Sequence, residues 1–298
     1  MVDIARDAME GERWRLGTKE YCAVVILDVR NAFNAANWGR IMRALFNMAT
    51  PPYLVEILNN YFQDRKVIYL TDEGEQEYVA KAGVPQSSLL GRILWNTMYD
   101  GVLRLRLPNG TTIVGFADDI AIVSVAKTVR EIEEKTNTAI RNVGAWLDEA
   151  GLTLAAHKTE AVLISGRKIV EKMIVTFGES RIESKRAIKY LGIIIDDSLS
   201  FKEHVKYIGE KASVTQRALA RMMPNIGGPD PFKKRIISAI VTSIMLYACS
   251  IWSEALSVGT TRRILSLVYR LSAIRRVSGF RTVADEAAKG NTNRYIDG

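Results

Sequence analysis

Two adjacent aspartates, Asp118 and Asp119, are the residues in this sequence that most directly suggest chemistry. They stand between two short apolar runs, residues 112–116 and 120–125, whose β-branched and aromatic side chains predict strands. The intervening Ala-Asp-Asp predicts a tight hairpin with its acids at the tip. Aspartate is also common in ordinary turns, where it bonds nearby backbone amides. Two neighbouring negative charges repel, however, and need a compensating cation, so the hairpin alone fits either a plain turn or a functional site.

A third carboxylate, Asp28, comes from a distant part of the chain. It ends the continuous apolar run of residues 21–27, which predicts a buried strand. If that strand neighbours the hairpin, the carboxylates converge on one sheet edge. Oxygen ligands of this kind suit Mg²⁺, and two such ions activate a hydroxyl and stabilise a leaving oxygen in phosphoryl transfer.

Strand geometry separates the expected roles of the two hairpin acids. Because successive side chains alternate along a strand, Asp118 is favoured as the bridging metal ligand and Asp119 as the weaker one. Arg30 and Asn31 follow Asp28 and would line the substrate side of the same loop.

Composition narrows the class of protein. The 298 residues are 48% hydrophobic, which allows a sizeable core in one or two domains. Both cysteines lie in apolar stretches, which favours buried thiols in a reducing compartment over disulfides or a zinc site. The start has no signal-peptide pattern. Residues 236–252 carry no charge but are short for a membrane span and contain Ser and Thr, so a buried helix is favoured.

Positive charge is concentrated at one end of the chain. The net charge is +8, and residues 199–298 hold 16 of the 41 Lys and Arg but only 7 of the 33 Asp and Glu, a net of +9. The remaining 25 basic and 26 acidic residues leave residues 1–198 at −1. Such segregation favours contact with a nucleic-acid backbone, with a solubilising surface as the alternative.

The apolar spacing predicts an α+β body followed by helices alone. Helices are expected at residues 38–48, from 52, at 89–107 and 127–150, with a frayed helix within 1–20. Strands are expected at residues 161–164, 172–177 and 189–195, with a hairpin at 65–80. After residue 198 three helices are expected. The predicted domains are residues 1–198, 199–283, and a disordered tail at 284–298.

With these motifs in place, the chain resembles the reverse transcriptase domain of non-LTR (LINE-type) retrotransposons, in the arthropod group that inserts into ribosomal DNA or telomeres. The resemblance covers about residues 10–283 and rests on five motifs: residues 26–34 (ILDVRNAFN), 82–91 (AGVPQSSLLG), 116–119 (FADD), 151–160 and 190–192 (YLG). It implies a right-hand polymerase palm, with an antiparallel sheet and packed helices, followed by an all-helical basic thumb. Fewer than 28 residues precede Asp28, so the fingers and endonuclease segments of a parent polyprotein are expected to be missing and the chain to be an N-terminally truncated fragment.

The resemblance also implies roles for matching residues. The expected metal carboxylates, holding two Mg²⁺ or Mn²⁺ ions, are Asp28, Asp118 and Asp119, with Lys158 as a proton donor to pyrophosphate. The expected nucleotide-binding residues are Val29, Phe33, Gln86 and Ser87, with Phe33 as a steric gate against a ribose 2′-hydroxyl. The expected primer grip is Tyr190, Leu191 and Gly192. The expected backbone contacts are Lys202, Lys206, Arg217, Arg221, Arg262 and Arg263.

Plainer alternatives remain for three of these residues: core packing for Phe33, a turn lysine for Lys158 and a loop residue for Gln86. The implied partners are an RNA template, a DNA primer and dNTPs, with no membrane and no small-molecule cofactor beyond the metal. An intracellular, nuclear location is expected, without secretion.

Three positions depart from the family pattern. Ser87 stands where the family has glycine, which permits close backbone approach or a positive φ; Arg92 replaces a proline and Ala35 a serine. The leading hypothesis is an RNA-directed DNA polymerase that extends a primer poorly or not at all as this chain alone. The alternatives are a catalytically dead nucleic-acid-binding remnant and a scaffold.

Overall fold

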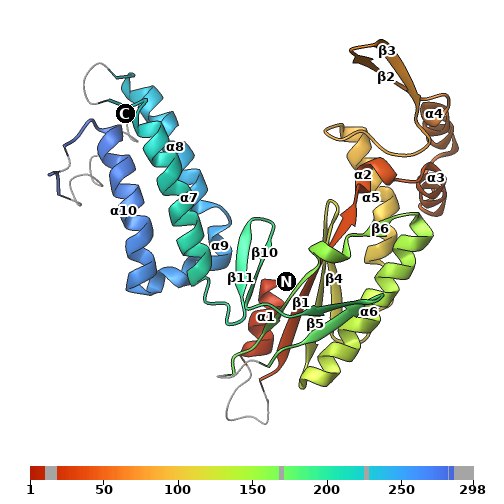
Figure 1. The fold of residues 1–298 in the computed structure, drawn as a ribbon, viewed down its shortest axis with the longest axis horizontal. Helices are drawn as coiled ribbons and strands as arrows, with labels where there is room; N and C mark the ends of the chain where they lie inside the picture. The colour runs from red at the N-terminus through yellow and green to blue at the C-terminus, as the bar shows by residue number, and fades with distance from the viewer. Residues whose placement is uncertain (11–18, 168–170, 225–227, 281, 285–298) are drawn as a thin grey trace. The chain divides into compact units, whose positions relative to one another are not determined.

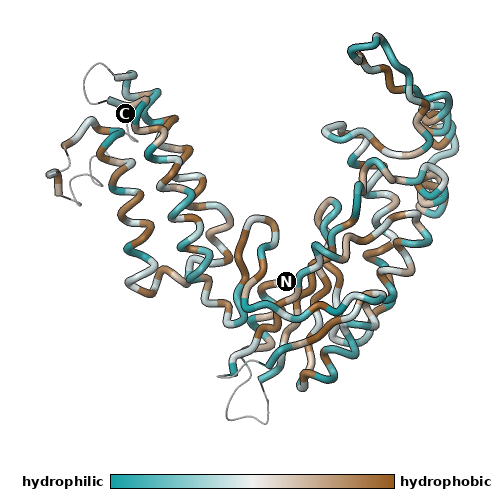
Figure 2. Tube along the Cα trace, viewed as in Figure 1, coloured by the Kyte–Doolittle hydropathy of each residue, from teal (hydrophilic) through white to brown (hydrophobic). Residues whose placement is uncertain are grey.

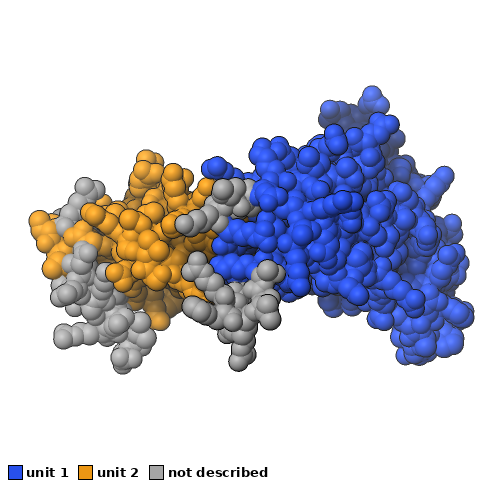
Figure 3. Space-filling model, turned by 90° about the horizontal axis from the view of Figure 1, so that it is seen from below, with its two compact units in different colours: residues 1–188 blue, residues 189–298 orange. Residues whose placement is uncertain are grey.

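A computed structural model describes residues 1–10, 19–167, 171–224, 228–280 and 282–284. It divides into two compact units, residues 1–188 and 189–298, shown in blue and orange in Figure 3. The boundary lies ten residues before the expected one at 198, because a short hairpin groups with the helices that follow it. Residues 285–298 of the expected tail lie outside the described residues.

The first unit is built on an antiparallel sheet (Figure 1). Its strands are β1 (Tyr21–Arg30), β4 (Thr111–Phe116), β5 (Asp119–Ala126), β6 (Thr153–Leu154) and β7 (Glu160–Ile164). The order is β4-β5-β1-β6, with β7 also paired to β1. Strand β1 is therefore central, which confirms the expected α+β class with an antiparallel sheet and places Asp28 beside the aspartate hairpin.

Strand β1 is buried on both faces, which explains its continuous apolar run. Its alternate residues from Tyr21 to Val29 join the main core, together with side chains of α5 (Leu89–Leu103) and α6 (Val129–Ala150). Helix α1 (Val2–Met9) also packs against β1, and its residues Val2, Ala5 and Ala8 are buried. Helix α1 is thus packed rather than frayed. Figure 2 shows the resulting hydrophobic colour along the central strands.

Burial also changes the chemistry of a thiol on β1. Cys22 is fully buried between Val125 and Ile164 of the two neighbouring strands. Burial raises the pKa of this thiol to about 12, so Cys22 is a core residue, as the sequence indicated.

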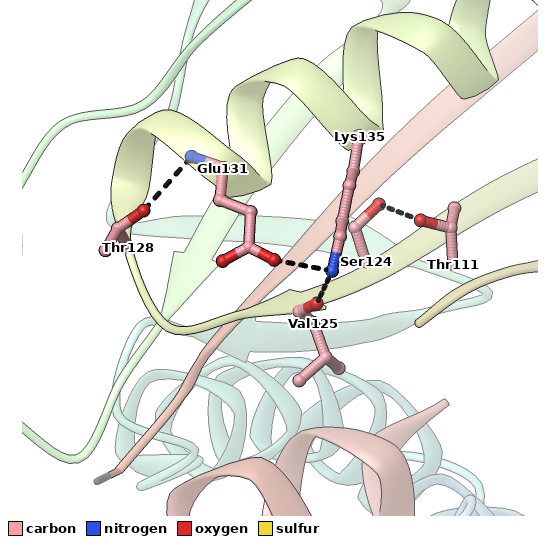
Figure 4. Close-up of polar contacts among 6 residues, drawn as sticks. All are labelled: Thr111, Ser124, Val125, Thr128, Glu131 and Lys135. Atoms are coloured by element: carbon pink, nitrogen blue, oxygen red, sulfur yellow. Dashed lines mark hydrogen bonds and ion pairs between the residues drawn. The ribbon is translucent and has the colours of Figure 1, made fainter. Parts of the chain in front are cut away.

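Helix α6 begins with a capping arrangement (Figure 4). The side chain of Thr128 accepts a hydrogen bond from the backbone of Glu131 at 3.2 Å. The Glu131 carboxylate pairs with Lys135 at 2.9 Å, and Lys135 also donates to the carbonyl of Val125 at 3.2 Å. The hydrogen bond from Lys135 lowers the pKa of Glu131. These contacts fasten the first turns of α6 to the end of β5.

Between β1 and α5 the chain forms α2 (Ala32–Ala35), α3 (Trp38–Asn47), α4 (Pro52–Phe62) and the predicted hairpin, β2 (Lys66–Thr71) with β3 (Gly74–Val79). Every residue of β2 and β3 is exposed. Helix α5 ends at Leu103, four residues before the expected end. After η1 (Ala156–Lys158) and β7, the predicted strand at residues 172–177 is part of a hairpin, β8 (Ile174–Phe177) with β9 (Ser180–Glu183).

The second unit begins within a hairpin and is helical thereafter. Residues 189–195, expected as one strand, form the turn and arms of β10 (Ala187–Tyr190) and β11 (Ile193–Asp196). The single-strand prediction is wrong because Leu191 and Gly192 both take positive φ, 46° and 82°, as a two-residue hairpin turn demands. The helices are α7 (Lys202–Ala220), α8 (Pro231–Leu246), α9 (Cys249–Trp252), η2 (Ser253–Ser257) and α10 (Gly259–Arg276).

A buried carboxylate joins β11 to α7. Asp196 is 7% exposed and accepts hydrogen bonds from the backbone and hydroxyl groups of Ser198 and Ser200 and from the backbone of Phe201. Burial alone would raise the pKa of Asp196, but these hydrogen bonds outweigh it and the pKa is lowered. The carboxylate therefore organises the turn that starts α7.

Within the described residues, no single helix has the length and apolar character needed to cross a membrane. One bent pair, Pro231–Leu246 with Cys249–Ser257, meets those criteria jointly, with a bend of 44° between its parts.

Candidate active site

The three predicted carboxylates meet where β1 and β5 pair. Asp28 and Asp119 are direct cross-strand partners, which places their side chains on one face of the sheet. Phe116 pairs with Asp119, so Ala117 and Asp118 form the two-residue turn of the predicted hairpin. The fold therefore unites residues that are far apart in the sequence.

The hairpin turn is strained and is held from outside. Ala117 has a φ of 55°, a conformation that costs a residue with a Cβ about 1–2 kcal/mol. Helix α5 supplies two restraints: the indole of Trp95 donates to the carbonyl of Ala117 at 2.9 Å, and the hydroxyl of Tyr99 donates to that of Asp119 at 3.2 Å. Sequence reasoning missed both residues, because an aromatic residue in an apolar helix carries no signal of a polar contact.

Like charges dominate the electrostatics of the hairpin. Burial raises the pKa of Asp119, and the neighbouring carboxylates of Asp118 and Asp28 raise it further. The Lys158 ammonium supplies a counter-charge, lying 2.9 Å from Oδ2 of Asp28. The cluster is thus short of positive charge, as the sequence argument required.

Lys158 reaches Asp28 because its segment is fastened to the same strand. Strand β6 pairs with Val29 and Arg30, and the backbone of Ala155 donates to the carbonyl of Asp28 at 2.8 Å. The following 3₁₀ turn, η1, carries Lys158 over the carboxylate. Lys158 is therefore more than an ordinary turn lysine, because it forms an ion pair with Asp28 at the site.

An open pocket of about 400 Å³ brings most of the predicted residues together. Its lining comes from β1, α2, the second motif, the hairpin turn and η1: Asp28, Val29, Arg30, Asn31, Ala32, Phe33, Asn34, Gln86, Asp118, Ala155, His157 and Lys158. Asp119 and Ser87 do not line it. His157, which directly precedes Lys158 in the sequence, lines this pocket together with the basic residues Arg30 and Lys158.

Phe33 is both packed and exposed to the pocket. Its ring stacks on Trp95 with centroids 5.2 Å apart, and it packs against the main core while lining the pocket. The two readings of Phe33 are therefore compatible, because core packing fixes the ring at the pocket wall.

The second motif is docked onto the first through its backbone. Val84 donates to the carbonyl of Phe33, and Gly83 to that of Ala36, both at 2.8 Å. A Cβ on Gly91 would lie 2.1 Å from the carbonyl oxygen of Pro85, so this approach needs glycine. The docking carries Gln86 to the pocket.

Ser87 adopts the backbone conformation expected of the family's glycine. Its φ is 61° in the turn that follows Pro85, and the side chains of Gln86 and Ser87 are exposed. Arg92 stands where the family pattern has a proline. Its backbone N–H donates to the carbonyl of Ser88 at 3.2 Å, which a proline cannot do.

The donor chemistry fits a divalent cation. Clustered carboxylates with a raised Asp119 pKa are hard oxygen ligands in need of positive charge. Among the described side chains, no three His, Cys, Asp or Glu form a ready metal-binding group. At this site the Lys158 ammonium pairs with Asp28.

The predicted primer-grip residues lie in the second unit and form the turn of β10–β11. Tyr190 is buried, and Leu191 and Gly192 make the turn. Tyr247, at the end of α8, donates through its hydroxyl to the carbonyl of Leu191 at 3.0 Å. A Cβ on Gly192 would lie 3.3 Å from the Tyr247 ring, so the turn and this ring are closely fitted.

The six basic residues expected on the nucleic-acid backbone are all exposed on helices of the second unit. Their spacing places four of them along one side of α7 and its last turn, since four and eleven residues each return close to the same face. These four are Lys202, Lys206, Arg217 and Arg221, the last of which directly follows α7, and Arg262 and Arg263 lie near the start of α10.

The family of the chain follows from comparison with known proteins. The family model described as reverse transcriptase (RNA-dependent DNA polymerase) matches residues 8–195, which include the whole carboxylate site. The chain belongs to this reverse transcriptase family. The expected resemblance is thereby confirmed.

Relatives of this reverse transcriptase come from insect retrotransposons. The putative 115 kDa protein of the type-1 retrotransposable element R1DM of Drosophila melanogaster is 23% identical over 96% of the chain, which spans 30% of that relative. A Pol polyprotein of the R1 2 element of Nasonia vitripennis is 27% identical over 69% of the chain and 52% of its own length. The chain thus spans about a third to a half of these relatives.

A solved structure shows a similar fold. A telomerase from Candida albicans, solved with a fragment of telomeric RNA, matches 97% of the chain and 54% of its own length, with a TM-score of 0.51 and 11% identity. At this identity the likeness concerns the fold, and it supports the polymerase architecture that the sequence motifs implied.

Proposed function

We propose that this reverse transcriptase chain catalyses RNA-templated transfer of deoxynucleotides to the 3′-hydroxyl of a DNA primer. The observation that carries the proposal is the pocket in which Asp28, Asp118, Phe33 and Gln86 meet. Residues 1–188 would act as the palm, and the basic helices after residue 198 as the thumb.

In this proposal Asp28, Asp118 and Asp119 hold Mg²⁺ or Mn²⁺. When bound, the ions activate the primer hydroxyl and neutralise charge on the triphosphate. Asp118 lines the pocket beside Asp28 and would hold the ions together with it, while Asp119 lies off the pocket wall and would support them.

The chain's own side chains position the nucleotide. The Phe33 ring, fixed by its stack on Trp95, would exclude a ribose 2′-hydroxyl. Gln86 would hold the incoming nucleotide and template strand, with Val29 lining the same pocket and Ser87 next to Gln86 in the chain. Lys158, whose ammonium pairs with Asp28, would donate a proton to the departing pyrophosphate. The Tyr190–Leu191–Gly192 turn would grip the primer.

One observation favours a second candidate, a nucleic-acid-binding protein without catalysis. Ser87 holds a positive φ at the place where the family has glycine, and its exposed side chain stands beside Gln86. Added bulk at a backbone approach slows or prevents nucleotide binding.

Primer extension on an RNA template decides between the two. We expect slow incorporation of a single dNTP with Mg²⁺ or Mn²⁺, and loss of at least about a hundredfold in Asp118→Ala, since charge neutralisation carries this chemistry. Asp148→Ala, which removes an exposed acid on α6, is the matched control. Equal incorporation by Asp118→Ala would refute the metal assignment, and no incorporation by the unaltered chain would favour the binding protein.

A further inference from the structure

A second pocket lies within the second unit, far along the chain from the carboxylates. It has a volume of about 210 Å³ and is formed by the first turn of α8 and the end of α10. Lys234, Arg235 and Arg276 line it with Ser278 and Phe232. None of these residues belongs to the basic set expected to contact a nucleic-acid backbone.

Lys234 is a buried cation without a carboxylate partner in the described part of the chain. It is 7% exposed, and its ammonium donates to the hydroxyl of Ser278 at 2.6 Å. An ammonium has three donors, so one neutral hydroxyl leaves its charge uncompensated. The nearby acid, Asp230, is engaged by another residue. Its carboxylate accepts a hydrogen bond from the backbone N–H of Lys233 at 3.0 Å and pairs with the Lys233 ammonium at 3.4 Å.

Two guanidinium groups add to this charge. Arg235 and Arg276 line the same pocket, and neither pairs with an acid among the described residues. Three cations around one cavity repel each other, and burial of Lys234 makes that repulsion stronger. An anion that enters the pocket relieves the repulsion, so the arrangement favours anion binding.

The shape and position of the pocket favour a phosphate group. Guanidinium forks match the oxygens of phosphate, and the N-terminal turn of α8 contributes the positive end of its dipole. The Phe232 ring is 69% exposed beside these cations. An exposed aromatic ring next to cations suits a nucleic-acid strand, whose bases stack on such rings.

We propose that this pocket binds a backbone phosphate of a single-stranded polynucleotide, with Phe232 against an adjacent base. The choice of a polynucleotide rests on the proposed reverse transcriptase function, whereas the anion site rests on Lys234, Arg235 and Arg276. The strand would thus be held at a second point, separate from nucleotide addition.

Binding of a fluorescent single-stranded oligonucleotide, followed by anisotropy without divalent metal or dNTPs, tests the proposal. In Lys234→Met and in Arg276→Gln we expect affinity to fall by about threefold or more, and the slope of log affinity against log salt to fall by about 0.7 for each lost contact. Lys233→Met is the matched control, because it removes an equal charge one residue away, outside the pocket. It should change both quantities much less. Phe232→Ala should weaken binding with no change in salt slope.

Folding is followed by thermal melting, and Arg276→Gln keeps the test valid if Lys234→Met unfolds, because Arg276 is only partly buried. Equal losses in Lys233→Met and the pocket variants would overturn the proposal in favour of diffuse attraction. Lys234-dependent binding of inorganic phosphate or phosphatidylserine vesicles, without such binding of the oligonucleotide, would overturn the polynucleotide assignment. Failure of the polymerase proposal appears instead as absent dNTP incorporation and leaves this binding readout unchanged.

Discussion

The Lys158 ammonium lies 2.9 Å from the Asp28 carboxylate, in the pocket that Asp118 also lines. The ion pair is partly exposed, so its own contribution to stability is small, at most about 1 kcal/mol. Its consequence is competition, since a divalent cation that uses Oδ2 of Asp28 must displace the ammonium.

That competition predicts the behaviour of Lys158→Met. The variant should melt slightly below the unaltered chain without metal, because three carboxylates are left with less counter-charge. Its gain in melting temperature with Mg²⁺ should be larger, since no ammonium competes. Titration calorimetry should show tighter Mg²⁺ binding, with Lys172→Met as a control for an exposed ion pair elsewhere. Identical Mg²⁺ affinities in all three proteins would show that the ammonium does not compete.

The raised pKa of Asp119 predicts a pH-dependent stability difference. Burial and the carboxylates of Asp118 and Asp28 raise this pKa in the folded chain. The protonated form is therefore favoured by folding, so its stabilising contribution is complete at low pH and is lost as pH rises through the folded pKa. Asp119→Asn should raise the melting temperature near neutral pH, with a gain that disappears as the pH falls below about 4. A gain in melting temperature that is constant across pH would contradict the repulsion of Asp119 by Asp118 and Asp28.

Ser87 predicts a stabilising substitution. A left-handed conformation costs a residue with a Cβ about 1–2 kcal/mol, and glycine avoids that cost but gains freedom in the unfolded chain. Ser87→Gly should therefore stabilise by about 0.5–1 kcal/mol in urea unfolding, and should speed incorporation if the side chain obstructs the nucleotide. The control is Ser180→Gly in β9, where φ is not positive and glycine should destabilise. A loss of stability in Ser87→Gly would show that the positive φ of Ser87 does not strain the folded chain.

The Asp196 carboxylate predicts a local weakness in the second unit. Its two oxygens accept hydrogen bonds from Ser198, Ser200 and the backbone of Phe201. Asp196→Asn should therefore lower the free energy of unfolding by about 1–3 kcal/mol. Because these bonds lower the pKa of Asp196, the stabilisation is present above the unfolded pKa and is lost as pH falls through the folded one. The difference between the proteins should shrink in acid.

Asp230→Asn provides the comparison for Asp196→Asn, since Asp230 is an exposed cap of α8 that accepts from the backbone of Lys233. Chemical unfolding of each protein at several pH values measures the effect. Equal, small costs for both substitutions would show that the buried network around Asp196 is not needed to hold α7.

The sequence predicted the site's frame because its signals are local. The apolar run before Asp28 and the apolar arms around Asp118 have strand composition, and the pairing of Asp28 with Asp119 follows once those strands are neighbours. The continuous run of β1 signalled burial on both faces, although it could not show that α1 covers one of them.

The contacts that the sequence could not predict are long-range. Trp95 holds the carbonyl of Ala117 through an indole that helical spacing marks only as core. The ion pair of Lys158 with Asp28 depends on β6 docking beside β1, which a two-residue strand does not signal. The sequence predicted one strand across the Leu191–Gly192 turn, because both flanking segments are apolar. The chain reverses direction there through positive φ angles, which the apolar pattern does not signal.

The buried thiol of Cys22 gives the chain an internal reporter. It lies on the strand that carries Asp28, and its pKa of about 12 leaves little thiolate at neutral pH. An alkylating reagent can therefore react with it only when the layer that covers its face of β1 opens. The rate of Cys22 labelling measures how often the strand that carries Asp28 is uncovered, and any nucleic acid or metal that stabilises the first unit should slow that rate.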